Sequence, residues 1–325
     1  MDNEQMRRSG KKEYKTVKKT KLRKRGFVCL GAIALIIIIA LYIVFSYRSG
    51  LNIAKENGVE TESETFDPVD NNDGKKTILI VGKDRMDEGA ERTDVVMIGQ
   101  YDYMKKDMKL VSLMRDIYVE IPGYQNYKIN AVYSLGGMEL LREVISHNFG
   151  LEVEEYVTVD YEAFTDTVDV INPDGIEIDV EKDMSEKIDT TLHKGVQQLN
   201  GQDLLAYARF RNDEEGDFGR VRRQQQVLSE IKDEVVSVGG VVKLPKIIGT
   251  GMGYVDTSMS NKEMYRMIAS FLVRGDKDIE SMTLPLENTY QFMDTSYTGN
   301  VIDMDFERNS EELHRFLDGN SEEEQ

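Results

Sequence analysis

The sequence has few of the residues that build disulfide frameworks and metal centres. Its 325 residues include one cysteine, Cys29, and three histidines. A single cysteine excludes an internal disulfide and a cysteine-based zinc site, and the dispersed histidines do not form an HExxH pattern. The chain also contains neither a GxSxG nor a GxxxxGK[ST] motif. The commonest serine-hydrolase and P-loop chemistries are therefore excluded.

Acidic residues outnumber basic ones overall, but not at the N-terminus. The chain carries 41 Lys+Arg and 59 Asp+Glu, a formal net charge of −18. Residues 1–25 hold 11 of the basic and 3 of the acidic residues, a balance of +8 that leaves −26 for the remainder. Composition alone would suit a nucleic-acid-binding arm, so the meaning of the basic segment depends on the residues that come after it.

An uncharged apolar run, Phe27–Phe45, comes directly after the basic segment. Its 19 residues approach the roughly 20 that cross a hydrocarbon core as a helix. Basic residues before such a run predict a cytoplasmic N-terminus, which favours topology over nucleic-acid binding. A cleaved signal peptide is the alternative, but the run is long for one and no small-residue cleavage site follows. We expect a basic cytoplasmic tail (1–25), a retained single-pass transmembrane helix (26–47) in the cell membrane, and an extracellular remainder.

The extracellular part reads as one α/β domain. Polar residues 48–75 predict a flexible linker, and the acidic residues 307–325 predict a frayed C-terminal tail. Between them, over 76–306, strands alternate with helices, which favours a three-layer α-β-α domain with a mixed central sheet. The turn at 102–107 predicts a hairpin. Expected strands are 76–82, 95–100, 108–113, 156–160, 176–180 and 279–284, and expected helices are 138–148, 162–170, 199–208, 218–238 and 261–273.

Two aspartates flank the loop between the first two predicted strands. Asp84 follows the first strand and Asp94 precedes the second. If the strands are neighbours, both carboxylates lie at one sheet edge, where hard oxygen ligands suit Mg²⁺ shared with phosphates. The alternative is that Asp84 is a turn residue and Asp94 a cap.

Arginines gather in the second half of the domain. Five occur within residues 209–223, and Arg115 follows a predicted buried strand. Guanidinium groups match phosphate oxygens in pairs, and a site for a diphosphate in a chain at −26 requires a dense local cluster of cations. On the predicted helix, Arg220, Arg223 and Gln224 lie on one face. The alternatives are a solvated ion-pair face with neighbouring acids, and for Arg115 a pair with Asp116.

Six ordered blocks resemble the LytR-CpsA-Psr family of cell-wall assembly proteins. The resemblance extends from about Lys76 to Ile231. The blocks are ILIVGKD, ERTDVVMI, LVSLMRDIYVEIPGY, KINAVYSLGG, LNGQDLLAYARFR and GDFGRVRRQQQVL. The single span with a basic cytoplasmic tail also matches the topology of the family.

The resemblance implies a phosphotransferase that moves an anionic glycopolymer, such as teichoic acid or a capsular polysaccharide, from a polyprenyl-diphosphate carrier to peptidoglycan through a phosphodiester bond. Asp84 and Asp94 would bind Mg²⁺, or Mn²⁺ in its place, and Asp94 and Arg115 would be catalytic. Family members hold the lipid tail in an apolar tunnel. The implied partners are the carrier-linked polymer, peptidoglycan and the membrane, without nucleic acid. The pyrophosphate ligands carried over from the family are Arg92, Arg115, Arg209, Arg211, Asp217, Arg220 and Gln224.

Two other functions remain open on the sequence. A non-catalytic envelope or regulatory protein could bind lipid diphosphates without turnover. A polyprenyl-diphosphate phosphohydrolase would release phosphate without any acceptor. Direct assay of the joined product separates both from the transferase.

Overall fold

A six-stranded mixed sheet forms the centre of the protein. The computed structural model describes residues 18–56, 64–69, 74–84, 92–272 and 279–319. The strand order is β10-β3-β2-β1-β6-β9, with β1 antiparallel to β2 and parallel to β6. The predicted hairpin is confirmed as β2–β3. The strands are β1 (Lys75–Asp84), β2 (Arg92–Asp102), β3 (Asp107–Leu113), β6 (Glu155–Asp160), β9 (Asp256–Thr257) and β10 (Glu280–Leu284).

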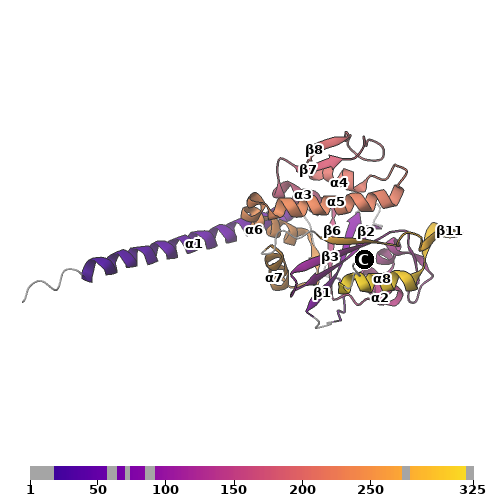
Figure 1. The fold of residues 1–325 in the computed structure, drawn as a ribbon, viewed down its shortest axis with the longest axis horizontal. Helices are drawn as coiled ribbons and strands as arrows, with labels where there is room; N and C mark the ends of the chain where they lie inside the picture. Colours follow the sequence, from indigo (N-terminus) through magenta and orange to yellow (C-terminus); the bar gives the residue numbers. More distant parts are fainter. Residues whose placement is uncertain (1–17, 57–63, 70–73, 85–91, 273–278, 320–325) are drawn as a thin grey trace, which may run out of the picture.

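Helices cover both faces of the sheet, so the predicted three-layer arrangement is confirmed (Figure 1). Side chains alternate along a strand: Leu79 and Val81 enter the core shared with α2 and α8, whereas Ile80 and Gly82 line a cavity on the other face. Helices α2 (Val132–Phe149) and α8 (Phe306–Asp318) belong to the first layer. The second contains α3 (Tyr161–Ile171), α4 (Gly201–Arg209), α5 (Gly216–Val236), α6 (Val238–Tyr254) and α7 (Asn261–Leu272).

Short hairpins extend each layer. The hairpin β7–β8 sits above α4 and α5 in Figure 1 and has its own apolar core with α4. On the other side, Ile302 of β12 bridges to Ile117 before β4. These small elements are β4 (Tyr118–Val119), β5 (Tyr127–Lys128), the 3-10 turn η1 (Ile129–Ala131), β7 (Ile176–Val180), β8 (Gly195–Leu199), β11 (Tyr290–Thr295) and β12 (Gly299–Met304).

Local capping explains why several predicted helices begin where they do. The Asp160 side chain accepts a hydrogen bond from Ala163 N at 2.6 Å at the start of α3. The Asn200 side chain accepts one from Asp203 N at 2.9 Å at the start of α4. Such caps satisfy backbone N–H groups that have no partner within the helix. Helix α6 and the hairpin β11–β12 were not predicted from the sequence.

The N-terminal helix α1 (Lys18–Glu56) is longer than predicted. It continues past residue 47, and its last turns pack on α6, where a Cβ added to Gly50 would overlap backbone atoms of Lys246 and Thr250. This corrects the prediction that a flexible linker begins at residue 48. Within α1, Ala32–Ile53 is long and apolar enough to cross a membrane, judged by length and composition.

The acidic C-terminal segment is also corrected. Residues 306–318 form the helix α8 instead of the start of a frayed tail. Asp305 caps its start by accepting from Arg308 N at 3.1 Å, and Gly319 ends it with a φ of 78°, a left-handed conformation that glycine adopts readily. Leu313 and Leu317, four residues apart on one helical face, are buried. Burial of this narrow apolar face holds an otherwise charged helix in place.

Candidate functional site

A cavity of 530 Å³ lies between the sheet and the helices α3, α4 and α5. Six of the nine predicted site residues line it, namely Asp94, Arg115, Arg209, Arg211, Arg220 and Gln224. They come from β2, from the segment after β3, and from α4, α5 and their connection. Residues far apart in the sequence therefore meet at one cavity.

The cavity changes character along the strands. Asp94 and Gly82 lie near one end of the sheet, and Ile80 opposite Met97 comes next. Farther along, Met108 pairs with Tyr101, seven residues beyond Asp94 and therefore about 23 Å away at the rise of a strand. Along α5, the lining changes from Arg220 and Gln224 to Val227 and Leu228. One end of the cavity is thus cationic and the other is apolar.

Arg115 is at the centre of the charged end. Its Nη1 donates to Asp94 Oδ1 at 2.8 Å, and its Nε lies 3.6 Å from both Asp116 Oδ2 and Asp217 Oδ1. That Nε is buried and makes no hydrogen bond within the described part of the chain. The Nε of Arg220 is also buried and makes no hydrogen bond among the described residues. Buried N–H donors ordinarily have partners, so both groups suit an anionic ligand.

Asp217 holds two of these arginines. Its Oδ1 lies 2.8 Å from Arg220 Nη2. Burial raises the pKa of Asp217, and the charges of Arg220 and Arg115 only partly oppose that rise. Burial lowers the pKa of Arg115, but the charges of Asp217 and Asp94 outweigh it, and the net shift is upward. Arg115 therefore stays charged, with Asp217 beside it as an ordering group.

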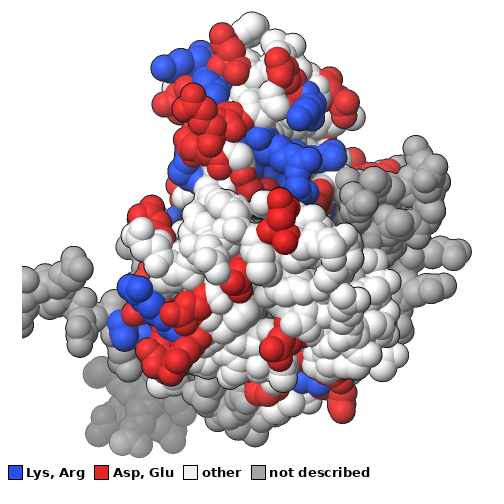
Figure 2. All heavy atoms as spheres, turned by 90° about the vertical axis from the view of Figure 1, so that its right-hand side faces the viewer, with Lys and Arg blue, Asp and Glu red and all other residues white. Residues whose placement is uncertain are grey.

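The remaining two cavity arginines face solvent. Arg209, the last residue of α4, stands over the ring of Tyr161 at 4.4 Å from its centroid, and Arg211 follows after the buried Phe210. The space-filling view shows Lys and Arg side chains gathered above a broad surface with few charged groups (Figure 2). This local cationic cluster occurs in a domain with an excess of acidic residues, as expected for an anion site.

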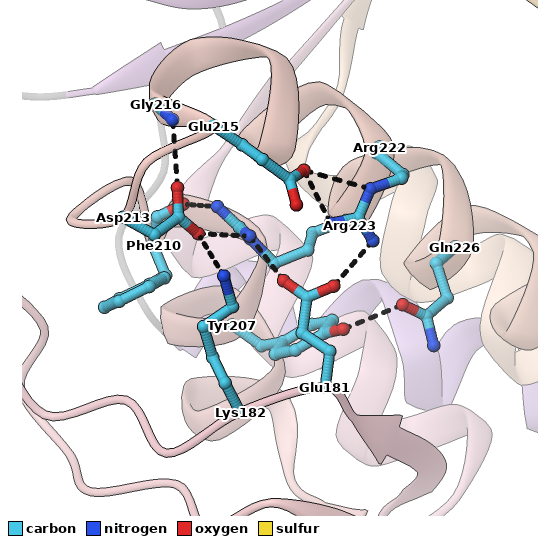
Figure 3. Close-up of polar contacts among 10 residues, drawn as sticks. All are labelled: Glu181, Lys182, Tyr207, Phe210, Asp213, Glu215, Gly216, Arg222, Arg223 and Gln226. Atoms are coloured by element: carbon cyan, nitrogen blue, oxygen red, sulfur yellow. Dashed lines mark hydrogen bonds and ion pairs between the residues drawn. The ribbon is translucent and has the colours of Figure 1, made fainter.

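Arg223 is not among the residues that line the cavity, contrary to the helical-face prediction. Figure 3 shows its guanidinium group directed toward Glu181 and Asp213. Its Nη1 contacts Glu181 Oε1 at 2.7 Å and Asp213 Oδ2 at 2.9 Å, and its Nη2 donates to Phe210 O at 2.5 Å. Arg222 pairs with Glu181 and Glu215 on the exposed side. For Arg222, which is about half exposed, the alternative of a solvated ion-pair face is correct. Arg223 is also ion-paired, but it is fully buried. The network nevertheless holds the carbonyl between Arg209 and Arg211.

Asp84 and Arg92 can be placed by backbone only. They are paired residues at the ends of β1 and β2, beyond an irregularity in register after Gly82. The two aspartates of the predicted metal pair therefore come from neighbouring strand ends. The side chains of Asp84 and Arg92 lie outside the part of the structure that is described.

The carboxylates at the cavity suit a magnesium ion that is also bound by substrate phosphates, and not one bound by protein ligands alone. Among the described residues, no group of three or more His, Cys, Asp or Glu side chains converges to hold a metal. Mg²⁺ is commonly held by one or two carboxylates together with substrate phosphates and water. Asp94, at the cationic end of the cavity, is a suitable carboxylate for that arrangement.

Sequence reasoning missed three polar residues of the cavity, namely Asp160, which also caps α3, Tyr161 and Lys187. Tyr161 starts α3 and supports Arg209, and the exposed Lys187 adds a further cation to the lining. Lys187 adopts a φ of 60° within the segment between β7 and β8, where no periodic pattern pointed to it. Tyr161 follows a capping aspartate and resembles an ordinary helix-start residue.

The chain is an α/β protein in which a cavity with a cationic end and an apolar end lies between the sheet and one helical layer. Comparison of its sequence with known families identifies the family. The chain belongs to the LytR_cpsA_psr family, whose sequence model matches residues 40–314. The match extends beyond the six blocks at both ends and includes α6, α7 and most of α8. The resemblance inferred from the blocks is therefore confirmed.

Individual relatives have different names. The chain is 45% identical over 280 residues to the regulatory protein MsrR of Staphylococcus aureus, covering 86% of each chain. It is 31% identical over 233 residues to the polyisoprenyl-teichoic acid–peptidoglycan teichoic acid transferase TagV of Bacillus subtilis, covering 68% of this chain and 59% of TagV.

Solved structures share the fold. The crystal structure of B. subtilis TagV aligns with a TM-score of 0.63 at 29% identity, over 75% of this chain and 97% of that one. A structure of TagT bound to LIIa-WTA aligns with a TM-score of 0.61 at 23% identity, over 81% and 96% of the two chains. At that identity, TagT supports the fold alone.

Proposed function

We propose that this protein is a membrane-anchored phosphotransferase that joins an anionic glycopolymer from a polyprenyl-diphosphate carrier to peptidoglycan through a phosphodiester bond. One observation carries the proposal: a single cavity has arginines at one end and Met97, Met108 and Leu228 toward the other. That combination matches a diphosphate attached to a long apolar chain. The name of TagV, which belongs to the same family, supports the same class of reaction.

The arginines bind and orient the diphosphate. Arg220 and Arg115 are pre-positioned by Asp217, and both line the cavity. Arg209 and Arg211 add exposed guanidinium groups, and Arg92 completes the set. Fixed donors cost little reorganisation when charge develops on the phosphate oxygens.

Transfer is a displacement at phosphorus. A peptidoglycan hydroxyl, which we assign to muramic acid, attacks the phosphorus that carries the glycopolymer, and the bond to the lipid-linked phosphate breaks. Asp94 or Asp84 accepts the hydroxyl proton through a carboxylate oxygen that does not contact the metal, and polyprenyl phosphate leaves. Arg115 stabilises the charge that develops during displacement. The product is a phosphodiester between polymer and peptidoglycan.

We propose that Asp94 and Asp84 hold Mg²⁺ together with the diphosphate oxygens. The ion would neutralise charge on those oxygens when bound. Asp94 already accepts a hydrogen bond from Arg115, so its carboxylate is oriented before any ligand arrives.

The apolar part of α1 would place the cavity beside a substrate that stays in the bilayer. We propose that α1 spans the cell membrane once, with the basic residues 1–25 in the cytoplasm and the α/β domain outside. Protease added to intact cells or right-side-out vesicles should then digest the α/β domain and spare the N-terminus. Protection of the domain would contradict this orientation.

Arg115→Ala in the full-length protein tests the chemistry. With Mg²⁺, a short lipid-diphosphate-linked glycan and peptidoglycan oligomers, mass spectrometry should find the joined product with the unsubstituted protein. Loss of one preorganised donor should slow its formation by about 10²- to 10³-fold. Arg222→Ala is the matched control, because Arg222 pairs with Glu181 and Glu215 outside the cavity. Equal rates for Arg115→Ala and the control would contradict the assignment.

The same assay separates the other functions. The name of MsrR, a regulatory protein, favours a second candidate in which the cavity binds lipid diphosphate without turnover. That candidate predicts saturable binding and no joined product. Phosphate release in the absence of peptidoglycan would indicate hydrolysis instead.

A further inference from the structure

The corner between α5 and α6 lies beside the apolar helix α1 (Figure 1). Tyr42 of α1 donates a hydrogen bond from its hydroxyl to Val242 O, early in α6, at 3.0 Å. Tyr42 lies three residues before Phe45, the end of the uncharged run. Three residues correspond to about 4.5 Å along a helix. The start of α6 is therefore close to the level at which the uncharged run ends.

Helices α1 and α6 run in the same direction where they touch. Proceeding along both chains, Tyr42 contacts Val242, and the Tyr47 carbonyl would overlap a Cβ added to Gly249. Farther on, Ile53 packs against the cluster formed by Ala163 and Tyr254. Because the order is parallel, residues that precede Val242 lie toward the apolar part of α1. The corner is thus the part of α6 that lies farthest toward the apolar part of α1.

Two valines at this corner are unusually exposed. Val241 and Val242 are 49% and 57% exposed, although both belong to a helix whose later residue Ile247 is buried. The close approach at Gly50 and Gly249 fixes these valines relative to α1, because a side chain at either glycine would overlap the facing backbone. Exposed apolar side chains held at this level meet lipid if α1 spans a bilayer.

The charges of α6 fit the same partner. The helix contains no acidic residue in its 17 residues, in a chain whose residues after the basic tail sum to −26. Its two lysines are Lys243, which donates from Nζ to Ile171 O at 3.1 Å, and Lys246. Apolar residues beside a lysine, without acidic neighbours on the same helix, suit the interface of an anionic bilayer.

We propose that Val241 and Val242 at the α5–α6 corner insert into the outer leaflet of the bilayer that α1 crosses, and so dock the domain on the membrane in one orientation. This inference rests on the proposed anchoring by α1 but not on the transfer reaction. The sequence predicted a flexible linker between the membrane and the domain. In the docked arrangement the domain instead contacts the lipid surface directly.

Docking would also orient the cavity. Helix α5 runs from the arginine end of the cavity to the corner, and Val236 is 16 residues beyond Arg220, or about 24 Å along the helix. The apolar lining residues Val227 and Leu228 lie between them. With the corner in the leaflet, the apolar part of the cavity lies between the bilayer and the arginines, in the order in which a lipid diphosphate would extend.

Tryptophan fluorescence tests the docking directly, because the chain has no tryptophan. The full-length protein is reconstituted in vesicles of phosphatidylglycerol and phosphatidylcholine that contain brominated lipid. The Val242→Trp variant should be quenched most by bromine near the headgroup end of the acyl chain. Ile38→Trp, within α1, should be quenched most by deep bromine. Phe292→Trp, at an exposed site on β11, should not be quenched.

The outcomes are distinct. If Ile38→Trp is quenched and Val242→Trp behaves like Phe292→Trp, α1 is anchored and the docking proposal is overturned. If Ile38→Trp is not quenched, the anchoring fails and the docking fails with it. Absence of a joined product in the transfer assay changes neither quenching result.

A functional readout adds a second line of evidence. Paired Val241→Asp and Val242→Asp substitutions should lower transfer from a vesicle-embedded carrier by about tenfold, because positioning relative to the bilayer is lost. Transfer from a short-chain, water-soluble carrier analogue should be unchanged, which excludes misfolding. An equal fall with both substrates would overturn the docking role.

Discussion

Ion pairs divide the arginines of residues 209–223 into two groups. Arg220 faces the cavity, whereas Arg223, three residues later on the same helix, is fully buried among Glu181, Asp213 and the Phe210 carbonyl. The sequence predicted a concentration of guanidinium groups correctly. Helical spacing could not separate these two side chains, because residues three apart are close neighbours on a helix. The position of the opposing carboxylates decided which one points into the cavity.

Glu181→Gln is expected to destabilise the protein in a pH-dependent way. Burial raises the pKa of Glu181, but hydrogen bonds and charge from Arg222 and Arg223 outweigh it, and the net pKa lies below the ordinary 4.5. A lowered folded-state pKa contributes stability above pH 4.5 that is lost as the pH falls through the folded-state value. The substitution should cost about 2 kcal/mol near neutral pH.

Urea denaturation of the detergent-solubilised protein measures this cost. The difference between Glu181→Gln and the unsubstituted protein should shrink as the pH is lowered below 4.5, the ordinary value for glutamate. Glu177→Gln is a control on the exposed face of β7. A difference that stays constant with pH would show that the ion pairs do not account for the cost.

The residues at which some helices begin and end depended on long-range contacts that cannot be predicted from composition. The spans of β1, β3, α3 and α5 were close to their predictions, because apolar periodicity and capping are local properties. Helices α1 and α8 were the exceptions. In α1, residues after 47 are polar and read as linker, yet they pack on α6. In α8, the many acidic residues led to the prediction of a frayed tail, although one narrow face of the helix, which includes Leu313, is apolar and buried.

Leu313→Ala distinguishes a packed α8 from a frayed tail. Leu313 is fully buried in the main core, so its truncation should cost about 2–5 kcal/mol. Glu311→Ala, on the exposed side of the same helix, should cost less than about 0.5 kcal/mol. Thermal or urea unfolding monitored by circular dichroism provides the comparison. Equal stabilities of the two variants would mean that α8 contributes nothing to the fold.

At the scale of the whole molecule, the cavity joins two separately packed regions. The sheet contributes Asp94 and Met97 on one side, and the helical layer contributes Arg220 and Leu228 on the other. A ligand that fills the cavity contacts both regions, so its binding free energy adds to the stability of their association. A ligand that contacts only the charged end buries less apolar surface and therefore binds with a smaller favourable free energy.

Thermal unfolding should therefore depend on the lipid tail of the ligand. A prenyl diphosphate at about 100 times its dissociation constant should stabilise the protein by about 2.7 kcal/mol and raise the Tm. Inorganic pyrophosphate at the same concentration should raise it less, since it leaves the apolar lining uncovered. Equal shifts from both ligands would contradict the assignment of the apolar end to the lipid chain.

Local patterns were sufficient to predict the mixed α/β fold, the apolar segment of α1, the family and several residues that line the cavity, because periodicity, capping and ordered motifs are properties of short stretches of chain. Long-range packing decided the rest. Because of it, Arg223 pairs with Glu181 and α8 packs in the main core. Lys187 and Tyr161 line the cavity, and α1 packs against α6. Each of these depends on which distant surfaces meet, and no short stretch of sequence contains that information.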